Sequence, residues 1–504
     1  MFFTTLPGRR LPFAVSFAIL PAVLSLGLGA SLLAGALPAL ATVVGAPADD
    51  PAVPGASAAV VPPPTATAAG VDPVAFETAF RIMAAALADD YAYRILGELC
   101  DTIGPRLCGS PRLEAAADWA VSMMEQAGFS SVRTEPFPVA HWQRGEEWAE
   151  VTQPVPFRLT LLGLGRSIGT PADGIEAEVL AVRDFTELEG RADEADGKIV
   201  LYFPPWEGYG KTVRYRRDGA IRAAAHGAVA CLIRSVTRDD SSTPHTGVMA
   251  YADTVPRIPA AALTVEDAGR LYRLAQRGLR PHVRLVMSAR ADTAATASNV
   301  VGDIRGREKP EEIVLVSGHL DSWDTGTGAH DDGAGAIIAL AAARQLKALG
   351  LIPRRTVRVV LYGCEEFGTA AGDAYHDAHQ QETVRHVAAI EADSGAFRPA
   401  GFSVRADSTI IDRIKQMAAP LRLLEADSVW AGWAGVDIHP LVEQGVPGIG
   451  LRTHADDYFL YHHSPADTFD KIDPADLARN VAAMAVLLYA LAEDPASLRE
   501  GMAP

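Results

Sequence analysis

The sequence predicts an α/β fold: a mixed, mostly parallel sheet with helices on both faces, and a smaller β-rich domain inserted into it. Continuous runs of aliphatic residues such as Ile313–Ser317 are typical of strands buried in parallel sheets. After residue 295 such strands alternate with helical patterns, which indicates a sheet covered on both faces. Residues 153–291 instead hold short strands and no clustered His, Asp and Glu, so we expect a separate module there.

The start of the chain reads as a secretory signal peptide. Arg9 and Arg10 precede an apolar run, and Ala39-Leu40-Ala41 offers a small-residue cleavage site. We therefore expect an exported protein, with a membrane contact only if this segment stays uncleaved as an anchor. The expected organisation is a signal peptide at 1–41, a Pro/Ala-rich linker at 42–74, catalytic domain parts at 75–152 and 292–495, the inserted domain at 153–291 and a tail at 496–504.

Helices are expected at 75–98 and 111–127, the second with Ser110 as its cap and Pro111 in its first turn. The remaining elements expected before residue 295 are strands Val132–Pro136, Glu178–Val182, Lys198–Phe203, Ala228–Ile233 and His282–Met287, and helices Ile221–His226 and Val265–Gln276.

Strand and helix alternate in the rest of the chain. A helix over Gly333–Leu349 follows Asp332, whose side chain we expect to cap it rather than to bind a metal. The last helix begins at Asp473-Pro474 and has apolar residues at helical spacing. The expected strands are Ile313–Ser317, Thr356–Tyr362, Val387–Ile390 and Pro447–Leu451.

Composition narrows the function. The formal net charge is -17 and no long Lys/Arg run occurs, which makes a nucleic-acid-binding protein a poor expectation. The chain has four cysteines. In an exported protein Cys100 and Cys108 are near enough in sequence to pair, and free buried thiols are an equal alternative.

Acids and histidines follow several of the predicted strands. Because open α/β sheets bind ligands at the carboxyl ends of their strands, these side chains should converge. Imidazole and carboxylate groups suit Zn²⁺, and buried carboxylates are costly unless they are paired or bound to metal. The sequence therefore predicts a metal site where the segments Gly318–Asp321, His330–Gly333, Cys364–Phe367 and Glu391–Ser394 converge, with Tyr461–Ser464 from a later loop.

The motifs GHLDS, HDDGAG, CEE, EADSG and HHSPADT, in this order, resemble those of the di-zinc exopeptidases, the family of secreted bacterial aminopeptidases and of plasma glutamate carboxypeptidase (carboxypeptidase Q). The resemblance covers roughly 75–152 and 295–492. The inserted module is similar to a protease-associated domain. The expected fold is thus zinc exopeptidase-like.

This resemblance implies a role for each matching residue. The chain would bind two Zn²⁺ ions, activate a bridging hydroxide, and hydrolyse short peptides or dipeptides. His319 and Asp393 would hold one ion, Glu366 and His463 the other, and Asp331 would bridge them. Glu365 would be the general base, and Asp321 would fix the tautomer of His319.

Three points stay open at this stage. Relatives stabilise the oxyanion with a Tyr, and some have it at the position of His462, so Tyr458, Tyr461 and His462 are all candidates. Glu443, Asp437 and Arg452 are candidate anchors for a peptide terminus. The alternatives to an exopeptidase are a non-catalytic receptor of the same fold and a single-zinc glutaminyl cyclase. A homodimer is compatible with the sequence.

Overall fold

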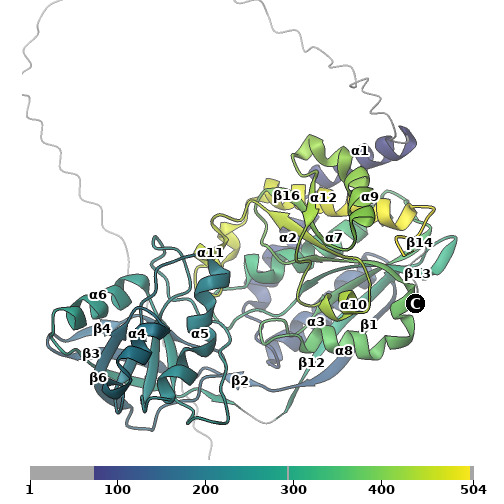
Figure 1. Cartoon of the computed structure of the whole chain (residues 1–504). Helices are drawn as coiled ribbons and strands as arrows, with labels where there is room; N and C mark the ends of the chain where they lie inside the picture. Colours follow the sequence, from purple (N-terminus) through teal and green to yellow (C-terminus); the bar gives the residue numbers. More distant parts are fainter. Residues whose placement is uncertain (1–72, 292–293, 500–504) are drawn as a thin grey trace, which may run out of the picture. The chain divides into compact units, whose positions relative to one another are not determined.

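The computed structural model describes residues 73–291 and 294–499, so the expected signal peptide and the linker up to residue 72 lie outside the described residues. Two eight-stranded sheets organise the described part of the chain (Figure 1). The first sheet has the strand order β1 (Ser130–Val139), β12 (Ala295–Ile304), β14 (Arg355–Tyr362), β13 (Lys309–His319), β15 (His386–Ala392), β18 (Gly448–Thr453), β16 (Pro399–Arg405) and β17 (Ser428–Ala431).

The centre of this sheet is parallel, and an antiparallel pair lies on each side of it. Strands β14, β13, β15 and β18 run parallel to one another, whereas β12 pairs antiparallel with β14 and β16 pairs antiparallel with β18. All eight residues of β14 are buried, as expected for a strand covered on both faces. The sequence prediction of a mixed, mostly parallel sheet is confirmed.

Helices cover both faces of the first sheet. Helix α7 (Ala334–Ala348) packs on β13, β14 and β15, and α12 (Pro474–Glu493) lies against α7. Helix α8 (Ala370–Ala378) lies on the opposite face, where Tyr375 meets Tyr362 of β14 edge to face (Figure 1). The other helices of this part are α1 (Pro73–Leu87), α2 (Tyr91–Glu98), α3 (Pro111–Gln126), α9 (Ser408–Ala418), α10 (His439–Glu443) and α11 (Tyr458–Tyr461), with the short η1 (Leu99–Ile103), η3 (Ala329–Gly333), η4 (Gln380–Arg385), η5 (Ala419–Leu424) and η6 (Phe469–Lys471).

Capping residues fix the helix starts that the sequence predicts. Ser110 accepts a hydrogen bond from the N–H of Leu113, and Asp473 accepts from Ala475 and Asp476. Among the described residues, α12 is the helix that is long and apolar enough to cross a membrane. Because 67% of its most apolar window is buried, it has the environment of a core helix.

The second sheet is formed by residues 147–287. Its order is β4 (Phe157–Leu159), β3 (Glu147–Gln153), β10 (His282–Met287), β6 (Ile175–Val182), β7 (Ile199–Tyr202), β8 (Ala230–Arg234), β9 (Ala260–Leu263) and β5 (Leu161–Gly163). The helices of this part are α4 (Phe185–Gly190), η2 (Ala192–Glu194), α5 (Tyr209–Ala224) and α6 (Val265–Gln276), and a separate ribbon pairs β2 (Trp142–Gln143) with β11 (Arg290–Ala291). We call residues 147–287 the sheet-2 module. Each face of its sheet has its own apolar cluster.

One predicted helix of this module is wrong in its bounds. The sequence predicts a helix over Ile221–His226, but α5 already begins at Tyr209. Its first half is rich in Lys and Arg, and only some of these residues are buried, so its apolar periodicity is weak. This start matters, because the first turns of α5 reach the candidate site.

Candidate metal centre

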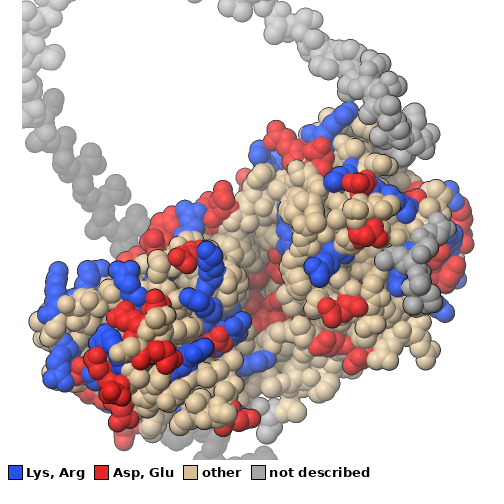
Figure 2. Space-filling model, in the orientation of Figure 1, with Lys and Arg blue, Asp and Glu red and all other residues tan. Residues whose placement is uncertain are grey.

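Three neighbouring parallel strands carry four of the predicted site residues. His319 is the last residue of β13, Glu365 and Glu366 follow the end of β14, and Asp393 follows the end of β15. Since β14, β13 and β15 pair in parallel, their carboxyl ends share one edge of the first sheet. Figure 2 shows acidic side chains inside a hollow of the surface, between the sheet-2 module and the part that carries the first sheet.

Asp331 lies in η3, just before α7, and is held there through its backbone. The carboxylate of Asp467 accepts hydrogen bonds from the N–H groups of His330 (2.7 Å) and Asp331 (3.1 Å). Asp467 is part of the HHSPADT motif, but sequence reasoning gave it no role. Its 2% exposure and these two bonds identify it as a positioning residue for Asp331.

Asp332 caps α7, as the sequence predicts. One carboxylate oxygen accepts from the N–H of Gly335 and the other from the N–H of His319, both at 3.0 Å. Because both oxygens already accept backbone hydrogen bonds, Asp332 is a poorer metal ligand than its neighbour. The helix also comes very close to the strands: a Cβ on Gly335 would lie 2.0 Å from the carbonyl oxygen of Ala392.

The carboxylate of Asp331 lies between two histidines. Its Oδ1 is 3.5 Å from Nε2 of His319, and its Oδ2 is 3.3 Å from Nε2 of His463. Nε2 of His463 is in turn 3.0 Å from Oε2 of Glu366. On the other side, Nε2 of His319 is 3.8 Å from Oδ1 of Asp393. The five predicted ligands are therefore brought together, with Asp331 in the middle.

Glu365 is placed differently from Glu366. Its Oε2 is 3.9 Å from Nε2 of His319, and 17% of its side chain is exposed, against 2% for Glu366. Burial raises the pKa of Glu365 well above its usual range, and the Asp393 and Asp321 carboxylates raise it further while His319 opposes them. A partly exposed carboxylate with a raised pKa beside these side chains meets the requirements of a general base.

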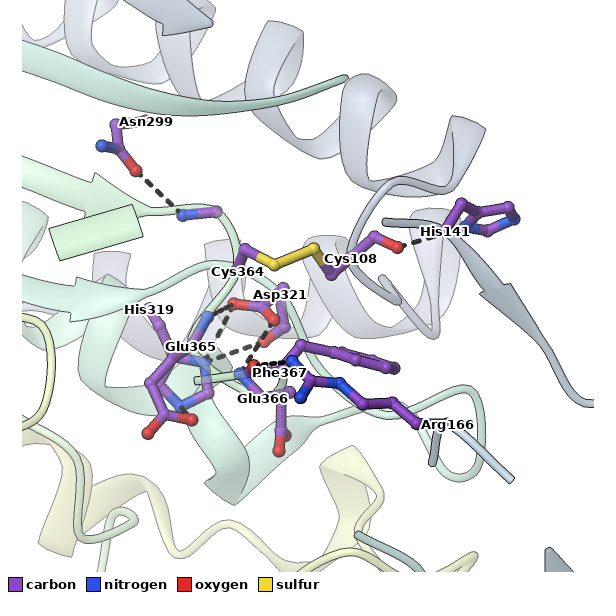
Figure 3. Close-up of a disulfide and its surroundings, with 11 residues drawn as sticks. Cys108, His141, Arg166, Asn299, His319, Asp321, Cys364, Glu365, Glu366 and Phe367 are labelled. Atoms are coloured by element: carbon purple, nitrogen blue, oxygen red, sulfur yellow. Dashed lines mark hydrogen bonds and ion pairs between the residues drawn. A yellow bond between two sulfur atoms is a disulfide. The ribbon is translucent and has the colours of Figure 1, made fainter. Parts of the chain in front are cut away.

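Asp321 does more than the sequence prediction assigns to it (Figure 3). Nδ1 of His319 lies 3.1 Å from its carbonyl oxygen and 3.4 Å from its carboxylate. Both neighbours set the tautomer in which Nε2 faces the other ligands. In addition, the carboxylate accepts hydrogen bonds from the N–H groups of Glu365 (3.0 Å) and Glu366 (3.2 Å), so it also positions the loop that carries both glutamates.

The Cys100–Cys108 pairing is wrong, and for Cys100 the alternative of a buried free thiol is confirmed. Cys108 pairs with Cys364, the residue directly before Glu365, with a Cα–Cα distance of 5.0 Å, and Figure 3 shows this bond beside Asp321. Cys100 is a buried free thiol in η1, where it lies against Arg106 and Thr327 instead of Cys108. Closeness in sequence misled the prediction, because the fold brings the end of β14 to the loop of Cys108.

The chemistry of the site calls for a cation. Nε2 of His319, Oδ2 of Asp331 and Oε1 of Glu366 are buried and have no hydrogen-bond partner among the described residues. Such groups are costly in a protein interior unless an ion satisfies them. Burial raises the pKa of Glu366 well above its usual range, and the nearby Asp331 carboxylate raises it further. The residues present therefore fit a metal centre.

Two groups of ligand atoms within 4.8 Å of one another support this: Asp331, His462 and His463, and His319, Asp332 and Asp393. In the first group His463 is the better ligand, because Nε2 of His462 is 3.9 Å from Asp331. In the second group both carboxylate oxygens of Asp332 accept backbone hydrogen bonds. Asp331 is therefore the better ligand for an ion at that place.

The sheet-2 module supplies the outer partner of His463. Nδ1 of His463 lies 3.4 Å from the carbonyl oxygen of Thr246, and the N–H of Thr246 donates to the carbonyl of His463 at 2.9 Å. Donation from Nδ1–H to Thr246 leaves Nε2 free to face a metal. The backbone of His463 has φ = 59°, a left-handed conformation that is uncommon outside glycine, and this paired backbone holds it.

Arg216 and Tyr209 of α5 reach the same place. Nη1 of Arg216 donates to the carbonyl of Thr246 (3.2 Å) and is 3.2 Å from Nδ1 of His463, and Nη2 donates to the hydroxyl of Tyr209 (2.9 Å). A Cβ on Gly247 would lie 2.1 Å from Nη1 of Arg216, so glycine makes room for the guanidinium. Sequence reasoning missed both residues because it started this helix too late.

The three candidate oxyanion donors differ in position. The hydroxyl of Tyr458 lies within hydrogen-bonding reach of the Asp331 carboxylate, and the ring of His462 stacks on His463 at 3.6 Å. Tyr461 instead stacks on His330 at 5.5 Å. Tyr458 and His462 therefore lie at the ligand cluster, whereas Tyr461 packs beside it.

The three candidate terminus anchors are also separated. Glu443 is exposed and pairs with His439 on α10. Asp437 is buried, and both its carboxylate oxygens lack a partner among the described residues. Arg452 donates to the hydroxyl of Ser394, next to Asp393, at 3.0 Å. Arg452 is therefore the cationic candidate nearest to the ligands.

Comparison with known proteins agrees with this site. The model of peptidase family M28 matches residues 299–488, a span that contains every predicted ligand. Carboxypeptidase Q of Mus musculus is 44% identical over 402 residues, which cover 80% of this chain and 86% of the relative. Carboxypeptidase Q of Homo sapiens is 42% identical over 406 residues, which cover 81% of this chain and 86% of the relative.

Solved structures show the same fold. A peptidase M28 precursor from Shewanella amazonensis superimposes with a TM-score of 0.82 at 36% identity, covering 84% of this chain and 98% of that one. A zinc aminopeptidase from Bacillus subtilis has a TM-score of 0.62 at 21% identity, covering 81% and 96%, and thus shares the fold. The strand-end ligand cluster and these relatives agree: the chain belongs to peptidase family M28 and is a metallo-exopeptidase.

Proposed function

We propose that this exopeptidase binds two zinc ions and hydrolyses dipeptides or short peptides, with Glu365 as its general base. The observation that carries the proposal is the position of Asp331, whose two carboxylate oxygens face His319 and His463 at 3.5 and 3.3 Å. A carboxylate placed in this way can bridge two ions. His319 and Asp393 would complete one site, and Glu366 and His463 the other.

Bound zinc would lower the pKa of a shared water and polarise the scissile carbonyl. The residues of the chain do the rest. Glu365 takes a proton from the attacking water and passes it to the nitrogen of the scissile amide, which leaves as a free amine. Asp321 keeps the backbone of Glu365 in place, through the 3.0 Å hydrogen bond described above. Asp467 and Thr246 hold Asp331 and His463, respectively.

The name carboxypeptidase Q supports a substrate with a free carboxyl terminus. The position of Arg452 beside Ser394 and Asp393 is compatible with this, since a guanidinium can bind a carboxylate. We propose Arg452 as the first residue to examine for that contact.

The remaining parts of the chain fit an exported enzyme. The Cys108–Cys364 disulfide suits an oxidising compartment, in agreement with a signal peptide at residues 1–41 and a linker at 42–74. We propose that the module between the two catalytic parts, at about 153–291, is a protease-associated domain. The module has its own eight-stranded sheet and its own apolar clusters, which supports an independent unit.

A peptide panel and elemental analysis test the proposal together. The same dipeptide sequences would be offered unblocked, N-blocked and C-blocked, and zinc would be measured in the purified protein. We expect about two zinc ions per chain and loss of hydrolysis when the carboxyl terminus is blocked. Active protein with one ion or none would refute the two-zinc site, and hydrolysis of C-blocked but not N-blocked peptides would identify an aminopeptidase.

A further inference from the structure

The first turn of α5 places one tyrosine of the sheet-2 module against the metal-binding loop. The ring of Tyr209 stacks on Phe459 and meets the ring of His462 edge to face, both with centroids 5.0 Å apart. His462 directly precedes the proposed ligand His463. The Glu365 and Asp331 carboxylates also lie close enough to act on the Tyr209 hydroxyl electrostatically. Tyr209 therefore lies beside the loop that carries the proposed ligand His463.

The hydrogen bonds of Tyr209 leave its hydroxyl hydrogen available. The phenolic oxygen accepts from Nη2 of Arg216 at 2.9 Å, and no acceptor for the hydroxyl hydrogen is present among residues 73–291 and 294–499. A hydroxyl has one hydrogen to donate. A cation that donates to its oxygen draws electron density from the O–H bond, which makes that bond a stronger donor.

Arg216 has an unusual environment for a cation. It is 4% exposed, and no carboxylate of the described residues lies within ion-pair distance of it. It donates to the carbonyl of Thr246 and to the Tyr209 hydroxyl, and its Nη1 lies 3.2 Å from Nδ1 of His463. A buried charge without an ion pair is costly, so a structural role alone does not explain it well. Arg216 orients the Tyr209 hydroxyl and holds the carbonyl of Thr246, which is the partner of His463.

The competing hydroxyl is that of Tyr458. It lies within hydrogen-bonding reach of the Asp331 carboxylate, and 8% of the residue is exposed. Tyr209 is less deeply buried than Tyr458. A donor to the reacting group must be within reach of the bound substrate. By this criterion Tyr209 is the better placed of the two.

We infer that Tyr209 is a catalytic residue supplied by the inserted module: its hydroxyl donates a hydrogen bond to the negatively charged oxygen that forms when water adds to the scissile carbonyl. Arg216 is the positioning residue that orients and polarises this hydroxyl. The inference rests on the proposed peptidase function. It also gives the module a part in the chemistry.

The test is Tyr209→Phe, assayed with the unblocked dipeptide that the wild-type enzyme hydrolyses fastest in the panel above. Removal of one oxyanion donor typically lowers kcat by about 10²–10³-fold. We expect a fall of this order with KM and zinc content close to wild type. Binding of a phosphinic analogue of that dipeptide, which mimics the tetrahedral carbon, should weaken by a similar factor in a calorimeter.

Tyr215→Phe is the matched control. Tyr215 lies on the same helix, and its hydroxyl also accepts from an arginine, Nη2 of Arg214 at 2.8 Å, but it is buried in the module core. It should keep the wild-type kcat and affinity for the analogue. Arg216→Gln should lose part of the same kcat, and its effect should not add to that of Tyr209→Phe, because the two residues act together.

The outcomes separate the two hypotheses. If zinc-loaded, active wild type and Tyr209→Phe share the same kcat and the same affinity for the analogue, the inference is overturned and the proposed function stands. If Tyr458→Phe instead shows the kcat loss with zinc retained, the donor is Tyr458. Wild-type protein that neither binds zinc nor hydrolyses any peptide of the panel would overturn the proposed function, and the inference with it.

Discussion

At the scale of single residues, Glu365 and Glu366 are neighbours with different surroundings. Glu366 is buried 3.0 Å from Nε2 of His463, whereas Glu365 is partly exposed beside His319. The loop that follows β14 turns the two side chains to different sides of the cluster. One of them can therefore bind a metal while the other handles protons.

This difference predicts opposite symptoms for two equivalent substitutions. Glu365→Gln keeps the shape but cannot accept a proton, so kcat should fall by about 10²–10⁴-fold with zinc content retained. Glu366→Gln removes an anionic ligand, so zinc content should fall first. Zinc analysis and kcat, measured in parallel on both variants, check this. Metal loss in Glu365→Gln together with full zinc in Glu366→Gln would reverse the two roles.

His386 gives a residue-scale prediction for stability, away from the ligands. Burial lowers its pKa from 6.5 to about 4, although the carbonyl of Glu382 opposes the shift. Between these two pKa values His386 binds a proton in the unfolded chain but not in the folded chain. The free energy of unfolding therefore decreases as the pH falls from about 6.5 to about 4. The shift corresponds to about 3 kcal/mol at most.

Denaturant unfolding at several pH values checks this. His386→Gln should unfold with a shallower dependence on pH than wild type over this range, whatever its stability at pH 7. His454→Gln, which changes an exposed histidine, is the control and should keep the wild-type slope. Equal slopes for the wild type and His386→Gln would contradict the assignment.

At the scale of secondary structure, strands with continuous apolar runs were predictable and polar helix starts were not. The predicted strand Thr356–Tyr362 matches β14 to within one residue, because every residue of this strand is buried. Helix α5 starts twelve residues earlier than predicted, because its first turns are covered by contacts from far along the chain: Tyr209 packs on Phe459, and Arg216 lies against His463. Such contacts do not produce a periodic pattern of apolar residues in the local sequence.

The same reason limits the prediction of the site. His319, Glu366 and Asp393 could be found because each lies at the end of a strand or just after it, and strand order brings these ends together. Asp331 and His463 could be found because they stand in motifs that resemble those of a known family. The roles of Asp467, Thr246 and Tyr209 could not, since they depend on loops whose paths are set by tertiary packing. The Cys108–Cys364 bond could not be predicted either, because tertiary packing brings these two cysteines together.

The close contact of α7 with the sheet gives a prediction for an element. A Cβ on Gly335 would lie 2.0 Å from the carbonyl oxygen of Ala392 and 2.4 Å from the carboxylate of Asp332. Gly335→Ala should therefore displace the start of α7, with a loss of about 3 kcal/mol or more, as for other overpacked sites. Gly210→Ala in α5 is the control, because nothing lies within 4 Å of its added Cβ. Thermal unfolding of both variants measures the difference, and equal midpoints would refute it.

At the scale of the whole molecule, the metal centre joins parts of the chain that are far apart in sequence. The first sheet, η3, the loop of His463 and the sheet-2 module all meet there. Buried carboxylates without a cation repel one another, so binding energy for metal is also folding energy.

Removal of metal should therefore affect more than catalysis. A chelator is expected to abolish hydrolysis and to lower the midpoint of thermal unfolding, and added zinc should restore both. Calorimetry with and without chelator measures the shift. Unchanged unfolding in protein that has lost its zinc and its activity would show that the acidic cluster is stable without a cation.

The Cys108–Cys364 disulfide has a further consequence for the intact molecule. It joins residues 256 positions apart, and every strand of the second sheet lies between them. A protease that cuts once at an exposed turn of this stretch, such as that of Asp253, would break the backbone but not release a fragment. Electrophoresis would show one band without reductant and two with it. A nicked enzyme would thus remain a single covalent molecule, with Glu365 still tethered to the amino-terminal half.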